Sequence, residues 1–421
     1  MAWLPITFEQ LRIGLFIKLD YNWLGHPFVR NTFTISFPSE IAIIRKKQLT
    51  KLYYDPDRSN ADPQAGLRGP ASEELTAEMI QDIQEDEKSF ERRKASQAQA
   101  VRSYHTAQEN GERKFADQMK RCTETVDMMI AGQAEGMRVA AQIIGSMMND
   151  LGQPSLSLSL VAPQAVDDPK QKLAAEALRS SILVLQAGAS LNLSQAEAQH
   201  LGLGAFFHNI GMFTLPPSVW QMPASAPSEQ FQQYPLLGKQ LLEAVPGVAP
   251  EIIQIVYQHQ ECLDGSGYPT GLASGELGPL PRLVGMIAKY NELIRSRSTD
   301  DSMSPAQALS QLYANMQNKF GLDVMEPVIA AMTVYPPGSF VELSDGSFGL
   351  VVQVNAQARM LPVVGVYAPD TLYKDSLIVD LAKDGMLFIR DSLSIKSVPP
   401  EVASALSAGQ MSGYMLLPAM P

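Results

Sequence analysis

The sequence predicts a multidomain α+β protein with a small β-rich N-terminal domain, long helices, an all-α domain and a small C-terminal β subdomain. Three observations support this prediction. Short apolar runs between turn residues open the chain, helical periodicity with clear start signals fills the middle, and alternating apolar runs return after residue 336. A chain of 421 residues is expected to form two or three domains. The expected divisions are residues 1–60, 61–153, 154–335, 336–400 and a flexible tail at 401–421.

The first domain is expected to be a small β-rich or α+β module. Residues 13–19, 28–35 and 51–54 are short apolar runs of the kind that form strands. The Asp-Pro-Asp-Arg-Ser turn at 55–59 closes the unit. The Gly- and Pro-rich stretch at 61–71 then predicts a linker to the helices that follow.

Residues 72–150 predict long helices, which are heavily charged up to Gly111. Beyond that point the apolar residues recur at alternating steps of four and three: Phe115, Met119, Cys122, Val126 and Met129, then Met137, Ala140, Ile144, Met147 and Leu151. Such a heptad-like seam either packs on its own domain or forms a homodimer through the 115–151 helix. The sequence leaves both interpretations open.

The all-α domain is predicted from helix-start signals. Ser194 and Glu197 form a capping box, and Ser228 can cap a later helix. Ser304 precedes a proline at the first helical position, where proline is tolerated.

The C-terminal β subdomain is predicted from a hairpin and two further strands. Residues 340–343 and 349–354 flank an Asp-Gly turn. Residues 360–367 and 377–381 read as additional strands.

Composition excludes several classes of function. The net charge of −11 gives no global attraction to nucleic acid or anionic lipid, although a local basic patch stays open. The two cysteines, Cys122 and Cys262, form no paired motif, which fits a reducing compartment. Neither a signal peptide nor an apolar run of roughly 18 residues is found. We therefore expect a soluble cytoplasmic protein with no membrane span and no nucleic acid polymer as partner.

The most informative segment is residues 257–269, which read YQHQECLDGSGYP. This segment resembles the HHExxDGxGYP signature of HD-GYP domains, the bacterial phosphodiesterases of cyclic di-GMP. Three other stretches resemble the same family: LSQAEAQHLGLGAFFHNIGMFTLP, YPLLGKQLLEAV and PLPRLVGMIAKYNELIRSRS. The resemblance implies an HD-type helical bundle over about residues 170–335. Residues 5–60 resemble the module that often precedes such domains.

The resemblance also implies a metal site, because HD-GYP enzymes use two or three iron or manganese ions, held by His and Asp, to activate water. This sequence departs from that pattern. The HD dipeptide is His208-Asn209, and Tyr234, Gln260 and Lys289 stand where the family has two His and an Asp. Amide and phenol groups are poor metal ligands, and a protonated amine cannot ligate.

We therefore expect a vestigial pocket with no catalytic residue and no metal, His208 and His259 being the residual candidates. Its members are Glu176, His208, Asn209, Tyr234, His259, Gln260, Glu261 and Lys289. We hypothesise that the Lys289 ammonium replaces the missing metals and pairs with Glu176 or Glu261. In the alternative interpretation both histidines are hydrogen-bonded core residues and Glu261 acts locally.

Two further groups are candidates for binding. The GYP loop, which is linked to partner binding in active relatives, comprises Asp264, Gly265, Gly267, Tyr268 and Pro269, and it is also compatible with a simple tight turn. Arg282, Arg295 and Arg297 could hold phosphates or be solvated.

The leading functional prediction is a catalytically degenerate HD-GYP-like protein, a regulatory or scaffolding component of bacterial cyclic di-GMP signalling that binds a signalling protein through the GYP loop. The first alternative is an active cyclic di-GMP phosphodiesterase with one atypical iron or manganese ion. The second is a receptor that binds the cyclic dinucleotide without hydrolysing it.

Overall fold

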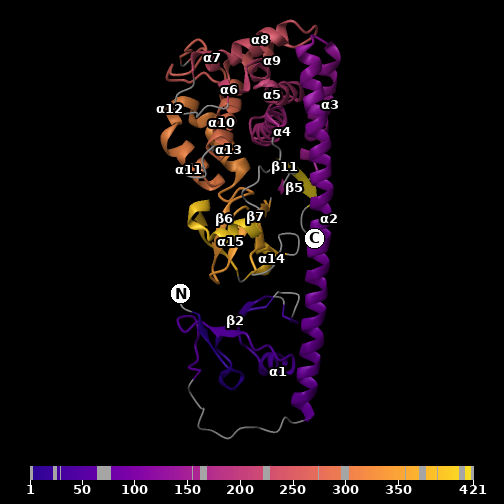
Figure 1. Ribbon diagram of the computed structural model, residues 1–421, viewed down its shortest axis with the longest axis vertical. Helices are drawn as coiled ribbons and strands as arrows, with labels where there is room; N and C mark the ends of the chain where they lie inside the picture. Colours follow the sequence, from indigo (N-terminus) through magenta and orange to yellow (C-terminus); the bar gives the residue numbers. More distant parts are fainter. Residues whose placement is uncertain are drawn as a thin grey trace.

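The computed structural model describes residues 3–21, 26–28, 30–63, 77–153, 155–161, 168–220, 228–273, 275–294, 303–355, 357–368, 376–385, 387–406 and 413–418. One long helix runs along the side of an elongated molecule (Figure 1). The N-terminal module lies at one end, the C-terminal β subdomain in the middle and the helical domain at the other end. The multidomain α+β prediction is confirmed.

The N-terminal module is a four-stranded antiparallel sheet with the order β1-β4-β2-β3. Its strands are β1 (Leu4–Pro5), β2 (Phe16–Leu19), β3 (Thr32–Thr34) and β4 (Leu52–Tyr54), with a short 3-10 helix at Phe8–Gln10. Strands therefore lie within all three predicted runs. Helix α1 (Pro38–Lys46) was not predicted. Its start is fixed by Glu40, whose carboxylate accepts hydrogen bonds from the backbone nitrogens of Ser36 and Phe37 at 2.6 and 2.9 Å.

The predicted helical segment is a hairpin of α2 (Ala77–Ile130) and α3 (Ala134–Leu151). The turn between them uses Gly132 at φ +72°, a backbone conformation that favours glycine. The apolar seam is buried inside its own chain, against side chains of the helical domain such as Leu178 and Phe206. The homodimer interpretation of this seam is therefore wrong, because the residues that would form the interface already fill the core.

The helical domain follows with the elements α4 (Pro169–Gly188), α5 (Gln195–Phe207), η3 (Ile210–Thr214), α6 (Pro217–Trp220), α7 (Glu229–Gln232), α8 (Tyr234–Glu243), α9 (Pro250–Gln258), α10 (Pro279–Ile294), α11 (Pro305–Asn315), α12 (Gln317–Phe320) and α13 (Leu322–Met332). The three predicted caps are confirmed. Ser194, Ser228 and Ser304 each accept a hydrogen bond from a first-turn backbone nitrogen.

The C-terminal sheet contains β6 (Phe340–Leu343), β7 (Phe348–Gln353), β8 (Val363–Val366), β9 (Leu377–Asp380) and β10 (Ile389–Leu393), with short helices at Leu381–Asp384, Ile395–Ser397 and Pro400–Ala405. The predicted hairpin is the antiparallel β6–β7 pair. Two strands from outside the predicted subdomain complete this sheet: β5 (Leu156–Val161) and β11 (Gly413–Pro418).

These two strands correct two predictions. Strand β5 lies in the region 154–335, which was expected to be all-α, and strand β11 lies in the tail, which was expected to be flexible. Strand β11 pairs with β5 along its whole length, and its side chains from Tyr414 to Leu417 are buried. Tyr414 and Leu416 enter the core shared with the β subdomain, whereas Met415 and Leu417 enter the core shared with α2 and α3. The C-terminal strand thus joins the two cores. No described helix is long and apolar enough to cross a bilayer.

Candidate functional site

The fold gathers the signature residues around one cavity of about 440 Å³. Helix α4 contributes Glu176, the end of α5 leads to Asn209, and α8 begins with Tyr234. The end of α9 and the loop after it contribute His259, Gln260 and Glu261, and α10 contributes Lys289. His208 lies behind this wall, with its ring centroid 5.3 Å from that of His259 in an edge-to-face arrangement. All eight residues predicted for the vestigial pocket therefore lie in or directly behind one site.

His259 is held between two partners that determine its tautomer. Its Nδ1 lies 2.8 Å from the carbonyl oxygen of Val256, so Nδ1–H is the donor there. Nε2 therefore carries the lone pair, and it accepts a hydrogen bond of 2.7 Å from the Tyr234 hydroxyl. Burial, reinforced by the neighbouring His208, lowers the pKa of His259 to about 3, so the ring is neutral at physiological pH. The lone pair that would bind a metal is engaged by the phenol.

Tyr234 is suited to this donor role. Its side chain is fully buried, and burial raises the pKa of its hydroxyl well above the usual value. The phenol therefore keeps its proton. His208 has the same backbone anchor as His259, because its Nδ1 lies 2.7 Å from the carbonyl oxygen of Ala205. Both histidines are thus buried and hydrogen-bonded to the preceding helical turn.

Glu261 folds the GYP loop. Its buried carboxylate accepts hydrogen bonds from the backbone nitrogen and hydroxyl of Thr270, at 2.7 and 2.6 Å, and from the backbone nitrogen of Leu272 at 2.9 Å. The backbone of Gly267 passes so close that a Cβ there would lie 2.4 Å from the Glu261 Cα. Gly265 adopts φ +72°, which also favours glycine. Glu261 and two glycines therefore define the path of this loop.

Lys289 does not pair with Glu176 or Glu261, which corrects that hypothesis. Its ammonium lies 2.8 Å from a carboxylate oxygen of Glu292, one turn further along α10. A partner three residues away on the same helix is within easy reach, whereas the Glu261 carboxylate is already occupied by the loop. Lys289 still lines the cavity and keeps a positive charge there.

The prediction that Arg282 holds a phosphate is also corrected. Its Nη1 and Nη2 donate to the two carboxylate oxygens of Asp323 at 2.8 and 2.6 Å, and Nη1 also donates to the carbonyl of Phe320. This buried guanidinium therefore links α10 to α12 and α13, and its donors are not available to a phosphate group. The other two candidates, Arg295 and Arg297, lie outside the described residues.

The sequence analysis missed several residues of the cavity, among them Lys319 and Phe231. The Lys319 ammonium contacts the Ser266 hydroxyl and lies 3.4 Å from the Asp264 carboxylate, so it ties α12 to the GYP loop. Lys319 is far from the loop in sequence, and no local pattern connects the two. Only the fold brings this second cation to the site.

The donor groups of the cavity do not fit an iron or manganese pair. Such a centre needs several carboxylates and free imidazole nitrogens around metals a few ångström apart. Here His259 Nε2 accepts from a phenol, the neighbouring positions are amides, and Lys289 and Lys319 add positive charge. Within the described ranges no group of three or more His, Cys, Asp or Glu side chains is arranged to hold a metal.

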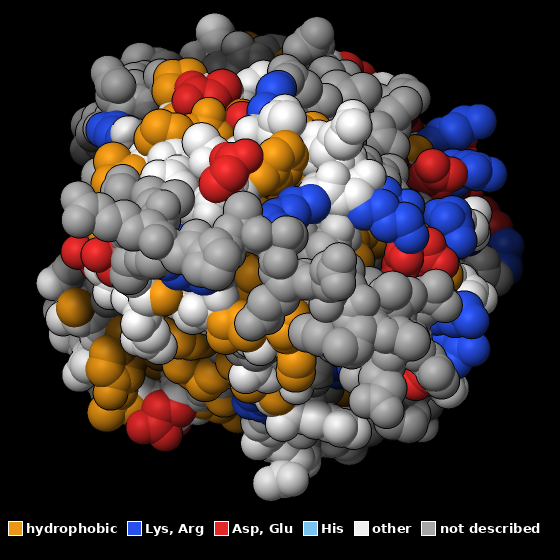
Figure 2. Space-filling view, turned by 90° about the horizontal axis from the view of Figure 1, so that it is seen from below, with side chains coloured by type: hydrophobic (Ala, Val, Ile, Leu, Met, Phe, Trp, Pro, Cys, Tyr) orange, Lys and Arg blue, Asp and Glu red, His pale blue; other side chains and the backbone are white. Residues whose placement is uncertain are grey.

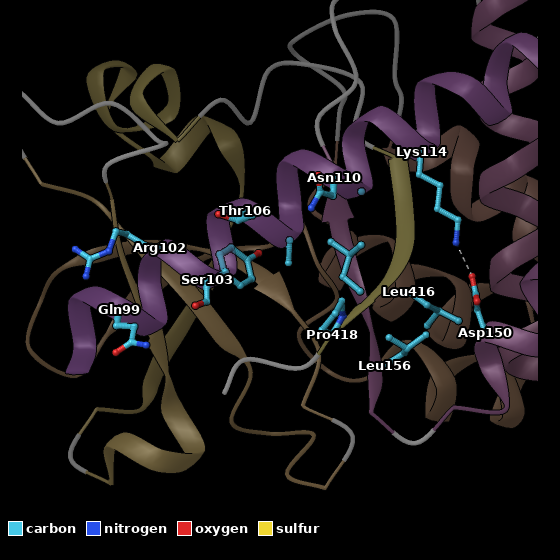
Figure 3. A pocket seen from close by; sticks show the side chains of 14 residues that line it. Gln99, Arg102, Ser103, Thr106, Asn110, Lys114, Asp150, Leu156, Leu416 and Pro418 are labelled. Atoms are coloured by element: carbon cyan, nitrogen blue, oxygen red, sulfur yellow. Dashed lines mark hydrogen bonds and ion pairs between the residues drawn. The ribbon is translucent and has the colours of Figure 1, made fainter. Parts of the chain in front are cut away.

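A larger cavity of about 850 Å³ lies between α2 and the β5–β11 ribbon (Figure 3). Its floor is apolar, with Leu156, Leu416 and Pro418, and at one end Lys114 pairs with Asp150 at 2.9 Å. None of the signature residues reaches it. We therefore assign the candidate site to the smaller cavity, where the signature residues converge.

Comparison with known proteins agrees with this placement. Residues 161–324 match the model of the HD domain, and residues 4–153 match a domain of unknown function, DUF3391. A cyclic di-GMP phosphodiesterase of Pseudomonas aeruginosa is 22% identical over 394 residues, which is 91% of this chain and 89% of that protein. A second, from Borreliella burgdorferi, is 22% identical over 53% of this chain and 56% of its own length.

A cyclic di-GMP phosphodiesterase response regulator of Xanthomonas campestris is 31% identical over a shorter region, 31% of this chain and 35% of the regulator. The matches place the signature residues within the HD domain and the four-stranded sheet within the DUF3391 module. The chain therefore contains an HD domain at residues 161–324, and a DUF3391 module at residues 4–153 precedes it.

Proposed function

We propose that this protein is a catalytically degenerate HD-GYP-like component of cyclic di-GMP signalling that regulates or scaffolds and does not hydrolyse the dinucleotide. Cyclic di-GMP enters the proposal because the similar proteins are named as its phosphodiesterases. The single observation that carries the loss of catalysis is the 2.7 Å hydrogen bond from Tyr234 to His259 Nε2.

The chemistry of the pocket supports this proposal. Hydrolysis of a phosphodiester by this class of site requires one cation to polarise the phosphate and another to supply hydroxide. An amide at position 209, a phenol at 234 and an ammonium at 289 supply neither a ligand set nor a general base. The remaining imidazoles are buried and hydrogen-bonded to the backbone.

The GYP loop supports the regulatory part of the proposal. Its shape depends on Glu261 and on contacts with Lys319 and Asn318, none of which requires a metal. The exposed residues Asp264, Ser266 and Thr270 are therefore presented by a preformed loop. We propose that this loop is where a signalling protein docks.

A second candidate, a receptor that binds cyclic di-GMP without cleaving it, is favoured by the cavity itself. The cavity offers about 440 Å³, the aromatic rings of Phe231 and Tyr268, and two ammonium groups. Aromatic rings stack on bases, and cations attract phosphates.

The deciding experiment measures metal content, hydrolysis and binding in the same preparation. Purified full-length protein is analysed for iron, manganese and zinc, then incubated with cyclic di-GMP and manganese, and titrated with cyclic di-GMP by calorimetry in a chelator. The proposal expects no stoichiometric metal and no linear product. Stoichiometric metal with turnover that disappears in His208→Ala would overturn it. Saturable binding without turnover would select the receptor over the scaffold.

A further inference from the structure

A cavity of about 310 Å³ lies between the N-terminal module and the C-terminal β subdomain. The two parts face one another on the same side of α2 (Figure 1). Cavities of this size at a domain boundary, with apolar walls and a few polar groups, are typical sites for small ligands. The signature residues lie elsewhere, so this cavity raises a question separate from that of the HD domain.

Strand β2 gives the cavity a charged wall. Side chains alternate along a strand, and Ile17 and Leu19 are fully buried in the core of the N-terminal module. Lys18 therefore projects from the opposite face, and it lines the cavity together with Asp20, the residue that follows β2. In the described part of the chain neither of them is paired with an opposite charge. The Lys18 ammonium lies 6.0 Å from the centroid of the Trp3 ring.

The β subdomain gives the cavity an apolar wall. Phe348, Leu377, Leu387 and Val402 line it from that side. Trp3, which stacks on Phe16 with ring centroids 5.7 Å apart, adds an aromatic surface from the module. The N-terminal module therefore contributes Lys18 and Asp20, and the β subdomain contributes most of the apolar surface together with the carboxylates of Asp345 and Glu401.

Two other charged residues of the cavity, Arg30 and Asp345, join the two domains, and the carboxylate of Glu401 also lines it. Arg30 forms an ion pair with Asp384, and the Thr32 hydroxyl donates to Asp345. Asp345 also accepts a hydrogen bond of 2.9 Å from the backbone nitrogen of Ser347. These contacts hold the walls in place, and Lys18 and Asp20 offer a cation and an anion on the same side of the cavity.

Figure 2 views the molecule from the end that carries the N-terminal module, and it shows separate basic and acidic side chains with apolar ones between them. This face as a whole carries no uniform charge that would attract an ion of one sign. Recognition in the cavity therefore depends on the local pair of opposite charges, Lys18 on β2 and Asp20 just after it.

We propose that this cleft binds a small zwitterion with a large apolar or aromatic group, such as an apolar α-amino acid. Its carboxylate would pair with Lys18, its ammonium with Asp20, and its side group would lie against Phe348 and Leu377. Two opposite charges two residues apart in the chain, both lining one cavity, suit the adjacent charges of a zwitterion. Because such a ligand contacts both domains, its binding stabilises their docked arrangement.

The test is calorimetric titration of the full-length protein with L-phenylalanine and L-leucine, and with 3-phenylpropionate and phenethylamine, which each lack one charge of phenylalanine. We expect saturable binding of L-phenylalanine. The two single-charge compounds should bind at least about tenfold more weakly than L-phenylalanine, because each loses a charged hydrogen bond. Lys18→Met and Asp20→Asn should weaken binding of L-phenylalanine by at least about tenfold. Lys51→Met, at an exposed lysine just before β4, is the matched control and should bind normally.

The proposal is overturned if neither amino acid binds saturably at millimolar concentration, or if 3-phenylpropionate binds as tightly as L-phenylalanine. Unchanged affinity in both Lys18→Met and Asp20→Asn would also overturn it. Thermal melting of the unliganded variants checks that these surface changes leave the fold intact. Cyclic di-GMP is absent from the assay, so the outcome is independent of the function proposed for the HD domain.

Discussion

The Tyr234 hydroxyl and His259 Nε2 satisfy each other inside the core of the helical domain, at a distance of 2.7 Å. Both side chains are at most 1% exposed. A buried polar pair of this kind stabilises the fold only while both partners remain, because an orphaned group loses its hydrogen bond with water as well. The pair is therefore part of the core of the helical domain.

The first prediction concerns this pair. Tyr234→Phe removes the donor and leaves a buried imidazole nitrogen without it, which should lower the free energy of unfolding by about 1–3 kcal/mol. Urea unfolding of both proteins measures the change. Tyr313→Phe, at a tyrosine that is 45% exposed, is the control and should stay within about 0.5 kcal/mol of the unchanged protein. Equal effects at the two positions would show that the hydrogen bond does not stabilise the fold.

The second prediction concerns pH. Burial lowers the pKa of His259 to about 3 in the folded protein, below the ordinary histidine value of 6.5, so the unfolded chain binds more protons between these two values. Stability should therefore be complete above about pH 6.5 and fall as the pH decreases toward 3. The contribution of one such group is at most about 1.4 kcal/mol per pH unit. His26, whose pKa is lowered to about 4 by burial, acts in the same direction.

Unfolding free energies measured from pH 7 to pH 4.5 test this slope. His259→Gln should show a shallower decline, because one buried titrating group has gone. Gln254→Ala, at an exposed residue of α9 that does not titrate, should keep the original slope. A parallel decline in His259→Gln and the unchanged protein would contradict the assignment.

The third prediction concerns the GYP loop. Glu261→Gln replaces one acceptor oxygen with an NH₂ group that cannot accept hydrogen bonds from Thr270 or Leu272. The free energy of local opening should fall by about 2 kcal/mol, which raises amide hydrogen exchange across residues 264–273 about thirtyfold. Glu276→Gln is the matched control, since its carboxylate makes one long contact of 3.3 Å to the Ala273 nitrogen. Unchanged exchange in the Glu261 variant would show that the loop is fixed by other contacts.

The structural features that sequence analysis could predict were the local ones. The capping box of Ser194 and Glu197 needs only residues three positions apart, and it is present with a hydrogen bond of 2.8 Å to the Ser194 backbone nitrogen. Strand β11 could not be predicted, because its burial depends on pairing with β5, far away in the sequence. Its short apolar run is compatible with a loose tail until that partner is known.

The site shows the same division. The residues that the signature predicted for the pocket lie around one cavity, with His208 directly behind it. The partner of each charge could not be read from the signature. Lys289 pairs with Glu292 on its own helix, and Lys319, which pairs with Asp264, belongs to a segment without a recognisable motif. Pairing of flexible charged side chains depends on which opposite charge is nearest in the folded chain.

The fourth prediction concerns the C-terminal strand. Leu416 is 7% exposed and belongs to the core shared with the β subdomain. Leu416→Ala should therefore lower the free energy of unfolding by about 2–4 kcal/mol, whereas a change in a flexible tail would have no effect. Leu322→Ala, at a leucine that is 44% exposed, is the control and should cost less than about 0.5 kcal/mol. Chemical denaturation measures both variants. Similar small losses of unfolding free energy in the two would show that this segment is a loose tail.

The fifth prediction concerns a variant in which the residue types of the HD-GYP signature replace four residues of the pocket. The combined variant Asn209→Asp, Tyr234→His, Gln260→His and Lys289→Asp restores two carboxylates and two imidazoles, and it frees His259 Nε2 from its phenol donor. Iron or manganese should then be retained at close to stoichiometric amounts by elemental analysis, because the pocket has gained ligands and lost a cation. The same variant carrying His208→Ala should retain less metal, and Lys289→Asp alone should retain none, because the Tyr234 hydrogen bond persists. Equal metal content in the unchanged protein and the combined variant would mean that the amides and the phenol do not prevent metal binding.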